Sequence, residues 1–240
     1  MTVCDCGQST TCDGCGHRLT NEWQVLAGDE LAALNRAKTK RRYVAGQALF
    51  VQGDPNTGVY CVDTGTVGIR QLDASGNTVL LGLAYPGDVL GYRSLLEGRA
   101  HKTSAEALGP CTACKLDRRA VLHLLERQPA LGLAFLRRST REVEKAHEAL
   151  FRTAVLSNRQ KLLHLLAGLA GQHGRASDDG THALDLPVSR RDLASMIGTR
   201  HETLSRIMGR LEDEGLARFS GRRVQIPSLA ALMASVAAMD

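Results

Sequence analysis

Four of the seven cysteines crowd into the first fifteen residues of the chain, and thiols at such short intervals can share a metal. They are Cys4, Cys6, Cys12 and Cys15, with glycines among them. The stretch has no apolar periodicity, so we expect a loop whose shape depends on what the thiols bind. Cys-x-Cys and Cys-x2-Cys arms suit a tetrahedral zinc ion, and four thiolates also suit an iron–sulfur cluster.

The other cysteines lie farther along the chain. Cys111 and Cys114 form a second Cys-x2-Cys pair, and a thiol–disulfide switch between them is a third candidate chemistry. Cys61 sits in an apolar run and is expected to be a small buried core residue. The eight histidines show no metal-binding spacing. The candidate metal ligands are therefore thiols.

A second group of chemically capable residues lies on one polar helix face near the C-terminus. Glu202, Ser205 and Arg206 are spaced i, i+3 and i+4, so they form one contiguous polar surface. Arginine donates in pairs to guanine, glutamate accepts from cytosine, and serine serves several base edges, which suits the major groove of DNA. The alternative is a solvated, charged helix face. His201 is a further candidate for DNA contact, and arginines that can neutralise phosphates surround the group: Arg190, Arg191, Arg210, Arg222 and Arg223.

The elements that must position this surface are two short helices and a hairpin. Ser189 and Asp192 open an apolar-periodic segment, and Gly198 marks a turn before the helix that carries Arg206. Two short helices joined through a glycine-containing turn form a helix-turn-helix. Two short β segments flank Ser220–Arg222 and are expected to form the hairpin known as a wing.

The first half of the chain has a different texture. Short apolar runs, punctuated by Gly, Asp, Asn and Pro, recur about every ten residues from Tyr43 to Leu116. Regularly spaced short strands of this kind indicate an antiparallel sandwich or barrel. A short helix is expected before them, from Thr20 to Ala37, because Trp23 and later leucines follow helical intervals.

Long helical periods begin after Asp117. Leu136, Val143 and Leu150 are seven residues apart. Small residues alternate with them: Ser139, Ala146 and Thr153. Such a heptad seam favours a long helix that pairs with its twin in a homodimer. The alternative is a helix packed on its own β domain.

Composition and charge set outer limits on function. The chain has 240 residues, 43% of them hydrophobic and 23% charged, as in an ordinary globular protein. Its formal net charge of +5 suits an acidic partner without naming one. It has neither an apolar run of membrane-spanning length nor a signal peptide at its start, so we expect a cytoplasmic protein. No phosphate-binding loop, nucleophile elbow or His/Glu metal pair is present, so we do not expect an enzyme.

The helix-turn-helix segment, Ser189 to Leu211, resembles the DNA-binding domain of the CRP/FNR family of bacterial transcription regulators. The β portion resembles the family through Gly46–Asp54 and Gly87–Tyr92. The resemblance implies an α+β fold with an N-terminal antiparallel β-roll of the cyclic-nucleotide-binding type, a long dimerisation helix and a C-terminal winged helix-turn-helix. The implied domains are a cysteine-rich cluster-binding loop (1–19), a β-roll sensor (20–130), the dimerisation helix (131–157) and the DNA-binding domain (158–240).

Two branches of this family differ in their ligand residues. Members that bind cyclic AMP carry a Gly-Glu pair and then Arg-Ser, which hold the ribose and the cyclic phosphate. Here Gly91-Tyr92 and Lys102-Thr103 stand in those places, and lysine cannot make the bidentate phosphate contact of arginine. The resemblance therefore argues against a cyclic-nucleotide ligand. The oxygen-sensing FNR branch fits better, because its Glu-x-x-Ser-Arg motif, which implies a palindrome with TTGAT-type half-sites, stands here as Glu202, Ser205 and Arg206.

FNR-type regulators hold a [4Fe–4S] cluster with three cysteines near the N-terminus and a fourth in the β domain. Cys114 falls at the position of that internal ligand. The usual N-terminal spacing, Cys-x2-Cys-x5-Cys, becomes Cys-x-Cys-x5-Cys-x2-Cys here, with the intervals reversed and one extra thiol. The implied ligands are Cys6, Cys12, Cys15 and Cys114, with Cys4 as a substitute.

These features together predict a homodimeric DNA-binding regulator in which a labile cluster senses oxygen, with nitric oxide as a further candidate signal. The cluster is expected to promote pairing along Leu136, Val143, Ala146 and Leu150. FNR-type proteins carry an acidic seam residue that keeps the apo form monomeric; Ala146 stands there, so we expect readier dimerisation of the apo protein. The hairpin at Asp73–Gly76 is the candidate contact with RNA polymerase. The alternatives are a regulator of this family with a structural zinc site or a thiol–disulfide switch, and a redox or metal-binding protein without specific DNA binding.

Overall fold

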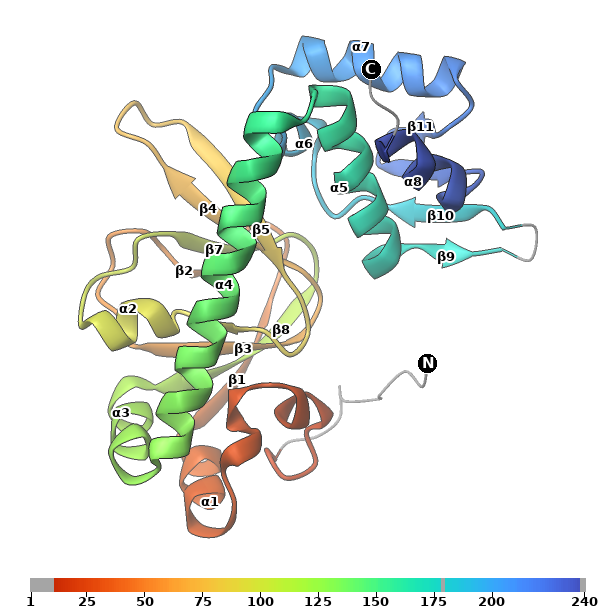
Figure 1. The fold of residues 1–240 in the computed structure, drawn as a ribbon. Helices are drawn as coiled ribbons and strands as arrows, with labels where there is room; N and C mark the ends of the chain where they lie inside the picture. Colours follow the sequence, from red (N-terminus) through yellow and green to blue (C-terminus); the bar gives the residue numbers. More distant parts are fainter. Residues whose placement is uncertain (1–10, 178–179, 238–240) are drawn as a thin grey trace. The chain divides into compact units, whose positions relative to one another are not determined.

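The computed structural model describes residues 11–177 and 180–237, and the chain divides into two compact units, Met1–Lys145 and Ala146–Asp240 (Figure 1). The first unit is a β domain with helices packed on it, and the second is a helical unit with a small sheet. The α+β fold class predicted from the sequence is confirmed. Within the described ranges, no helix is long and apolar enough to cross a membrane.

Two four-stranded antiparallel sheets form the β domain, as the recurring turn signals predict. The strands are β1 (Lys38–Tyr43), β2 (Ala48–Phe50), β3 (Gly58–Thr64), β4 (Val67–Leu72), β5 (Thr78–Ala84), β6 (Val89–Leu90), β7 (Ser104–Ala107) and β8 (Cys111–Asp117). One sheet has the order β1-β8-β3-β6 and the other β2-β7-β4-β5. Side chains from both sheets, such as Phe50, Tyr60 and Ala105, fill one core. The other face of β3 and β8 is thereby left for the N-terminal segment, because successive side chains of a strand point to opposite faces.

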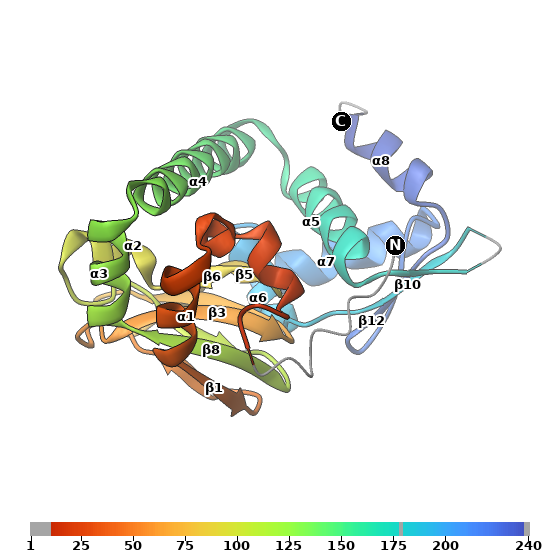
Figure 2. The same ribbon diagram turned by 90° about the horizontal axis from the view of Figure 1, so that it is seen from below.

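The segment from Thr20 to Ala37, expected to be a single helix, is bent. Its pieces and the turn before it are the 3₁₀ turns η2 (Gly16–Thr20) and η3 (Glu22–Val25) and the helix α1 (Gly28–Arg36). The Asn21 side chain caps η3 by accepting a hydrogen bond from the Trp23 backbone N–H at 3.1 Å, and Leu26 is extended. The bends bury Trp23 and Leu26 in one cluster with residues of β3 and β8. Figure 2 shows this N-terminal segment, in red, lying over the sheet that contains β3 and β8. The apolar spacing therefore predicted correctly which residues are buried, but the prediction of one continuous helix was wrong.

The long helix α4 begins in the first unit, where its first turns pack on the β domain. The helices after the strands are α2 (Tyr92–Glu97), α3 (Arg118–Arg127) and α4 (Pro129–Val155). Leu131 and Phe135 of α4 are buried. The Phe135 ring stacks on Tyr92 with centroids 5.3 Å apart and meets Trp23 edge-on at 5.4 Å. The first turns of α4 thus share a core with the N-terminal segment.

The later turns of α4 carry the exposed heptad seam. Leu136 is 62% exposed, Val143 52% and Leu150 68%. A helix of 27 residues is roughly 40 Å long, so the seam extends well past the turns that are packed. An apolar stripe of this length on one helix is the kind of surface that a second helix covers.

Arg138 ties α4 to two other segments of the first unit. Its guanidinium lies 3.3 Å from Glu22, 3.1 Å from Asp88 and 3.1 Å from Glu142. It also lies over the Tyr92 ring, 5.5 Å from the centroid. Glu22 is only 4% exposed, so its carboxylate depends on this arginine for compensation of its charge. Helix α4, which carries the seam, is thereby joined by an ion pair to η3, the turn that follows the cysteine-rich loop.

The second unit contains the predicted helix-turn-helix and wing. Its elements are α5 (Asn158–His173), β9 (Arg175–Ala176), β10 (His182–Asp185), α6 (Arg190–Met196), α7 (His201–Asp213), β11 (Arg218–Ser220), β12 (Arg223–Ile226) and α8 (Leu229–Ala237). Ser189 and Asp192 form a capping box that starts α6. Gly198, with a φ of 68°, makes the left-handed turn before α7, a conformation that favours glycine. The wing strands β11 and β12 belong to a sheet ordered β11-β12-β10-β9.

Candidate thiol pocket and nucleic-acid interface

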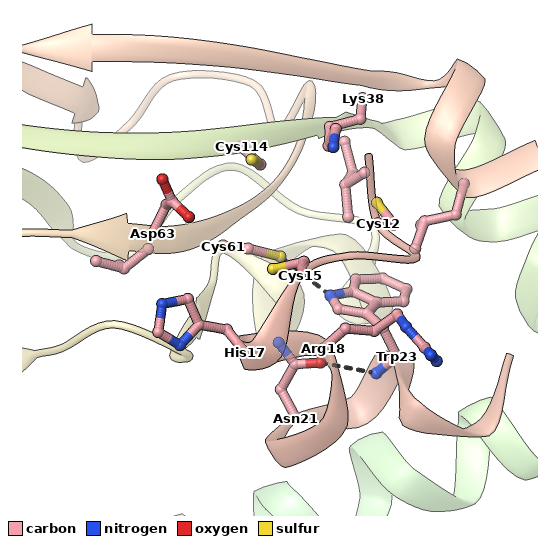
Figure 3. Close-up of a pocket in the computed structure, with 13 residues that line it drawn as sticks. Cys12, Cys15, His17, Arg18, Asn21, Trp23, Lys38, Cys61, Asp63 and Cys114 are labelled. Carbon is pink, nitrogen blue, oxygen red and sulfur yellow. Dashed lines mark hydrogen bonds between the residues drawn. The ribbon is translucent and has the colours of Figure 1, made fainter. Parts of the chain in front are cut away.

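Four cysteines line one pocket of the first unit (Figure 3). Cys12 and Cys15 come from the N-terminal loop, Cys61 from β3 and Cys114 from β8. The pocket has a volume of about 40 Å³. Polar and aromatic side chains complete its lining, among them His17, Asn21, Trp23, Lys38 and Asp63. Three of the predicted ligands, Cys12, Cys15 and Cys114, thus line the same pocket, while Cys4 and Cys6 lie outside the described residues.

The strand register explains why two of these thiols face the same way. Cys61 and Cys114 are directly opposite each other in the antiparallel pairing of β3 with β8. Opposite residues of such a pair point to the same face, with Cβ atoms about 5 Å apart. Cys61, expected to be a small buried core residue, is half-buried: it packs against the core and also lines the pocket. Sequence alone did not reveal this, because the register between the strands was unknown.

The alternation of side chains along a strand places Cys111 and Cys114 on opposite faces of β8. The two are three residues apart on β8, so their side chains point to opposite faces of the sheet. Cys111 is buried in the core between the sheets, whereas Cys114 lines the thiol pocket. A disulfide between them, the form of thiol switch considered from the sequence, conflicts with this arrangement. The strand spacing was available in the sequence and could have excluded it.

Burial favours the protonated form of three of these thiols, those of Cys12, Cys61 and Cys114. Burial raises the pKa of Cys114 to about 11, although Lys38 opposes the shift. Burial likewise raises the pKa of Cys12 and of Cys61, where a hydrogen bond from Trp23 opposes it. That bond runs from the indole N–H to the Cys61 sulfur over 3.0 Å. A bound cation would reverse the preference, since thiols that coordinate a metal are deprotonated.

The cysteines surround the pocket without converging on one point. Across residues 11–177 and 180–237, no three His, Cys, Asp or Glu side chains stand close enough together to hold a metal ion. The donor chemistry nevertheless fits a thiolate-bound group, because the pocket combines several sulfurs with an indole N–H donor and the ammonium of Lys38.

The residues compared with a cyclic-nucleotide site lie around a different cavity. Gly91, Tyr92, Lys102 and Thr103 all line a space of about 520 Å³ in the first unit. The Lys102 ammonium pairs with Glu97 at 3.0 Å. Both side chains of this ion pair are exposed, and Arg93, Arg138 and Lys145 bring further positive charge to the lining of the cavity.

Helix α7 separates an apolar face from a polar one. Glu202, Arg206, His201 and Arg210 are exposed, and Ser205 is half-buried. The opposite face packs inward through buried residues: Leu204, Ile207, Met208 and Leu211. The predicted base-contacting residues thus share a face that is open to a partner. At the start of α6, Arg190 is half-buried and Arg191 exposed.

Arg222 has a structural contact that the sequence did not suggest. Its guanidinium donates a hydrogen bond of 2.9 Å to the carbonyl of Pro187, just before α6. The tip of the wing is thereby joined to the entrance of the helix-turn-helix. Arg191, which is exposed, is the better residue with which to test phosphate contacts.

Comparisons with known proteins agree with both halves of this description. Residues 40–128 match the cyclic nucleotide-binding domain family, and residues 160–235 match the Crp-like helix-turn-helix domain family. The transcriptional activatory protein AadR of Rhodopseudomonas palustris is 29% identical over 87% of this chain and 88% of its own length. An anaerobic regulatory protein of Pasteurella multocida is 23% identical over 83% of this chain and 72% of its own.

A solved structure has the same fold over most of the chain. FixK2 of Bradyrhizobium japonicum superposes with a TM-score of 0.71 at 23% identity, covering 85% of this chain and 99% of that protein. The two domain matches and the superposition agree on the order of the parts along the chain: a β domain, a long helix and a helix-turn-helix. The chain belongs to the CRP/FNR family of DNA-binding transcription regulators, and it is not an enzyme.

Proposed function

We propose that this regulator senses oxygen through a labile [4Fe–4S] cluster and, with the cluster bound, binds a TTGAT-type palindrome as a homodimer. The observation that carries the proposal is the pocket in which the N-terminal loop and the β domain bring their thiols together. The relative named as an anaerobic regulatory protein supports a response to oxygen. Nitric oxide, which also attacks iron–sulfur centres, is a second candidate signal.

The proposed ligands are Cys6, Cys12, Cys15 and Cys114, with Cys4 as a substitute. Cys12, Cys15 and Cys114 line the pocket, and the soft thiolates they offer are the ligands that iron–sulfur clusters take in proteins. When bound, such a cluster supplies a group that oxygen destroys. Transmission of the signal to α4, pairing of the two chains and contact with DNA are carried out by residues of the chain itself.

The chain offers a direct route from the loop to the dimer seam. The loop that bears Cys12 and Cys15 leads into Glu22, which contacts Arg138 on α4. Fixing the loop would favour one arrangement of α4, and a bias of a few kcal/mol is enough to shift a two-state equilibrium. Pairing along Leu136, Val143, Ala146 and Leu150 would then space two recognition helices about one turn of DNA apart.

Sequence readout is assigned to Glu202, Ser205 and Arg206, with His201, Arg190 and Arg210 as supporting contacts. Arg206→Ala is expected to weaken binding to the palindrome about 10- to 100-fold and to remove the preference over a scrambled site, because one bidentate base contact is worth about 1–3 kcal/mol. The measurement is a DNA titration with both duplexes.

Arg191→Ala is the matched control for this variant. It removes one positive charge near the same DNA surface and should weaken binding to both duplexes alike, with a shallower salt dependence. If Arg206→Ala kept its preference for the palindrome, the readout assignment would fail.

The hairpin between β4 and β5 is the proposed contact with RNA polymerase. Asp73 organises its tip by accepting 2.8 Å hydrogen bonds from the backbone N–H groups of Ser75 and Asn77. These bonds and the Asn77 side chain lower the pKa of Asp73, so the hairpin presents a defined, charged turn. A turn held in one shape loses little conformational entropy when a partner binds.

The deciding experiment is the iron and sulfide content of protein purified without oxygen, with its visible spectrum before and after air. We expect about four irons and four sulfides per chain and a brown colour that bleaches in air. Cys114→Ala should lose the iron, and Cys111→Ala should keep it, because only Cys114 faces the pocket.

A structural zinc ion is the second candidate, and the Cys-x2-Cys turn in the pocket favours it. Cys12 and Cys15 have the spacing of paired thiolate ligands in tetrahedral zinc sites. Colourless protein with one zinc per chain would overturn the oxygen-sensor proposal and leave DNA recognition by α7 intact.

A further inference from the structure

We propose that Cys61 is a metal-binding thiolate and that Cys12, Cys15, Cys61 and Cys114 form a complete four-sulfur site without Cys4 or Cys6. The proposal rests on the proposed function only in placing a metal centre in the thiol pocket. It holds equally for a cluster or for a single soft metal ion. It changes the assignment of the fourth sulfur, which the family resemblance places at Cys6.

The loop supplies one pair of sulfurs in a fixed turn. The Cys15 backbone N–H donates to the Cys12 carbonyl at 3.3 Å, which closes the Cys-x2-Cys segment into a tight turn. The Cys12 backbone N–H donates to the Asn35 side chain on α1 at 3.0 Å, so the turn is anchored to the domain. Two cysteines on such a turn can bind one metal together, as in Cys-x2-Cys zinc sites.

The sheet supplies the second pair on a rigid support. Cys61 and Cys114 are cross-strand partners on the face that the loop covers. Neighbouring strands hold their thiols at nearly fixed separation. Because no three donors among the described residues are close enough for one metal, binding requires the loop and the side chains to move toward this pair. Ligands on strands define a metal site more firmly than ligands on a free loop.

Trp23 gives Cys61 a feature of a ligand sulfur. The indole is buried, and its N–H donates to the Cys61 sulfur at 3.0 Å. A neutral thiol is a weak acceptor, whereas N–H donors to ligand sulfurs stabilise thiolates and tune metal–sulfur centres. Lys38, which also lines the pocket, adds positive charge beside Cys12 and Cys114. A residue that only filled space would not need the indole donor.

The test is an anaerobic Co²⁺ titration of the full chain, because the sulfur-to-cobalt charge-transfer absorption reports the number of bound thiolates. Wild type and the Cys4→Ala/Cys6→Ala double variant should bind one Co²⁺ with the same spectrum. Cys61→Ala should lose about a quarter of that absorption and bind at least tenfold more weakly, since even indirect ligand contacts are worth that much. Cys111→Ala, on the other face of β8, should match wild type.

A full spectrum in Cys61→Ala, with loss in the double variant, would place the fourth sulfur at Cys6 or Cys4 and overturn the proposal. So would the absence of thiolate absorption in wild type. Iron and sulfide analysis tests the oxygen-sensor function separately, so the two ideas can fail independently. If Cys61→Ala does not fold, alkylation of wild type with and without Co²⁺ decides: Co²⁺ should slow the labelling of Cys61 and leave that of Cys6 unchanged, and the reverse pattern contradicts the assignment.

Discussion

Val143→Asp is expected to leave the protein monomeric and to weaken its binding to a palindromic site about a thousandfold, the gain that two linked half-sites normally provide. Val143 is 52% exposed in the middle of the seam, between Leu136 and Leu150. In a parallel pair the two aspartates would face each other across the twofold axis, and like charges at that position oppose association. Sedimentation at micromolar concentration and a DNA titration measure the two effects.

The control for this variant is Arg141→Glu, which adds negative charge to the opposite face of α4. It should remain dimeric. Wild-type apo protein should also dimerise more readily than a relative with an acidic seam residue, because Ala146 adds no charge to the seam. A strictly monomeric apo form would refute this expectation, and a dimeric Val143→Asp would refute the seam itself.

The helix-turn-helix was predictable because its signals are local. The capping box of Ser189 and Asp192, the left-handed Gly198 and the apolar period of α7 all lie within a short stretch. The β domain was predictable for a similar reason, since turn residues mark the end of each strand. In both cases, neighbouring residues in the sequence determine the element.

The thiol pocket was only partly predictable, because it is assembled from distant segments. The N-terminal thiols and Cys114 could be named from spacing and resemblance. The place of Cys61 depends on the register of β3 with β8, and no local pattern encodes that register. The bend at Asn21 was missed because apolar spacing reports which residues are buried and is insensitive to a break between them.

The contacts of Arg138 could not be predicted either, because they also join segments that are distant in the sequence. On the sequence it is one of several arginines along a polar helix face. Its burial, at 15% exposure, follows from contact with Glu22 and Asp88, which lie far away in the chain. A long-range ion pair of this kind leaves no periodic signal. It is also the contact that joins the segment beside the thiol pocket to the seam helix.

Arg138→Leu is expected to lower the stability of the first unit by about 3 kcal/mol, because removal of one partner leaves the buried Glu22 carboxylate uncompensated. The only tryptophan of the chain, Trp23, lies next to Glu22 in this unit, so its fluorescence in a urea titration reports the unfolding of the unit directly.

The double variant Glu22→Gln/Arg138→Leu separates the charge effect from lost packing. It removes the stranded carboxylate and should recover most of the stability, since neutral groups of similar size often replace a buried ion pair at little cost. Equal losses in the single and double variants would assign the effect to packing around Tyr92 instead. Recovery in the double variant would establish that Glu22 needs Arg138, and therefore that the segment after the thiol loop is fastened to α4 by charge.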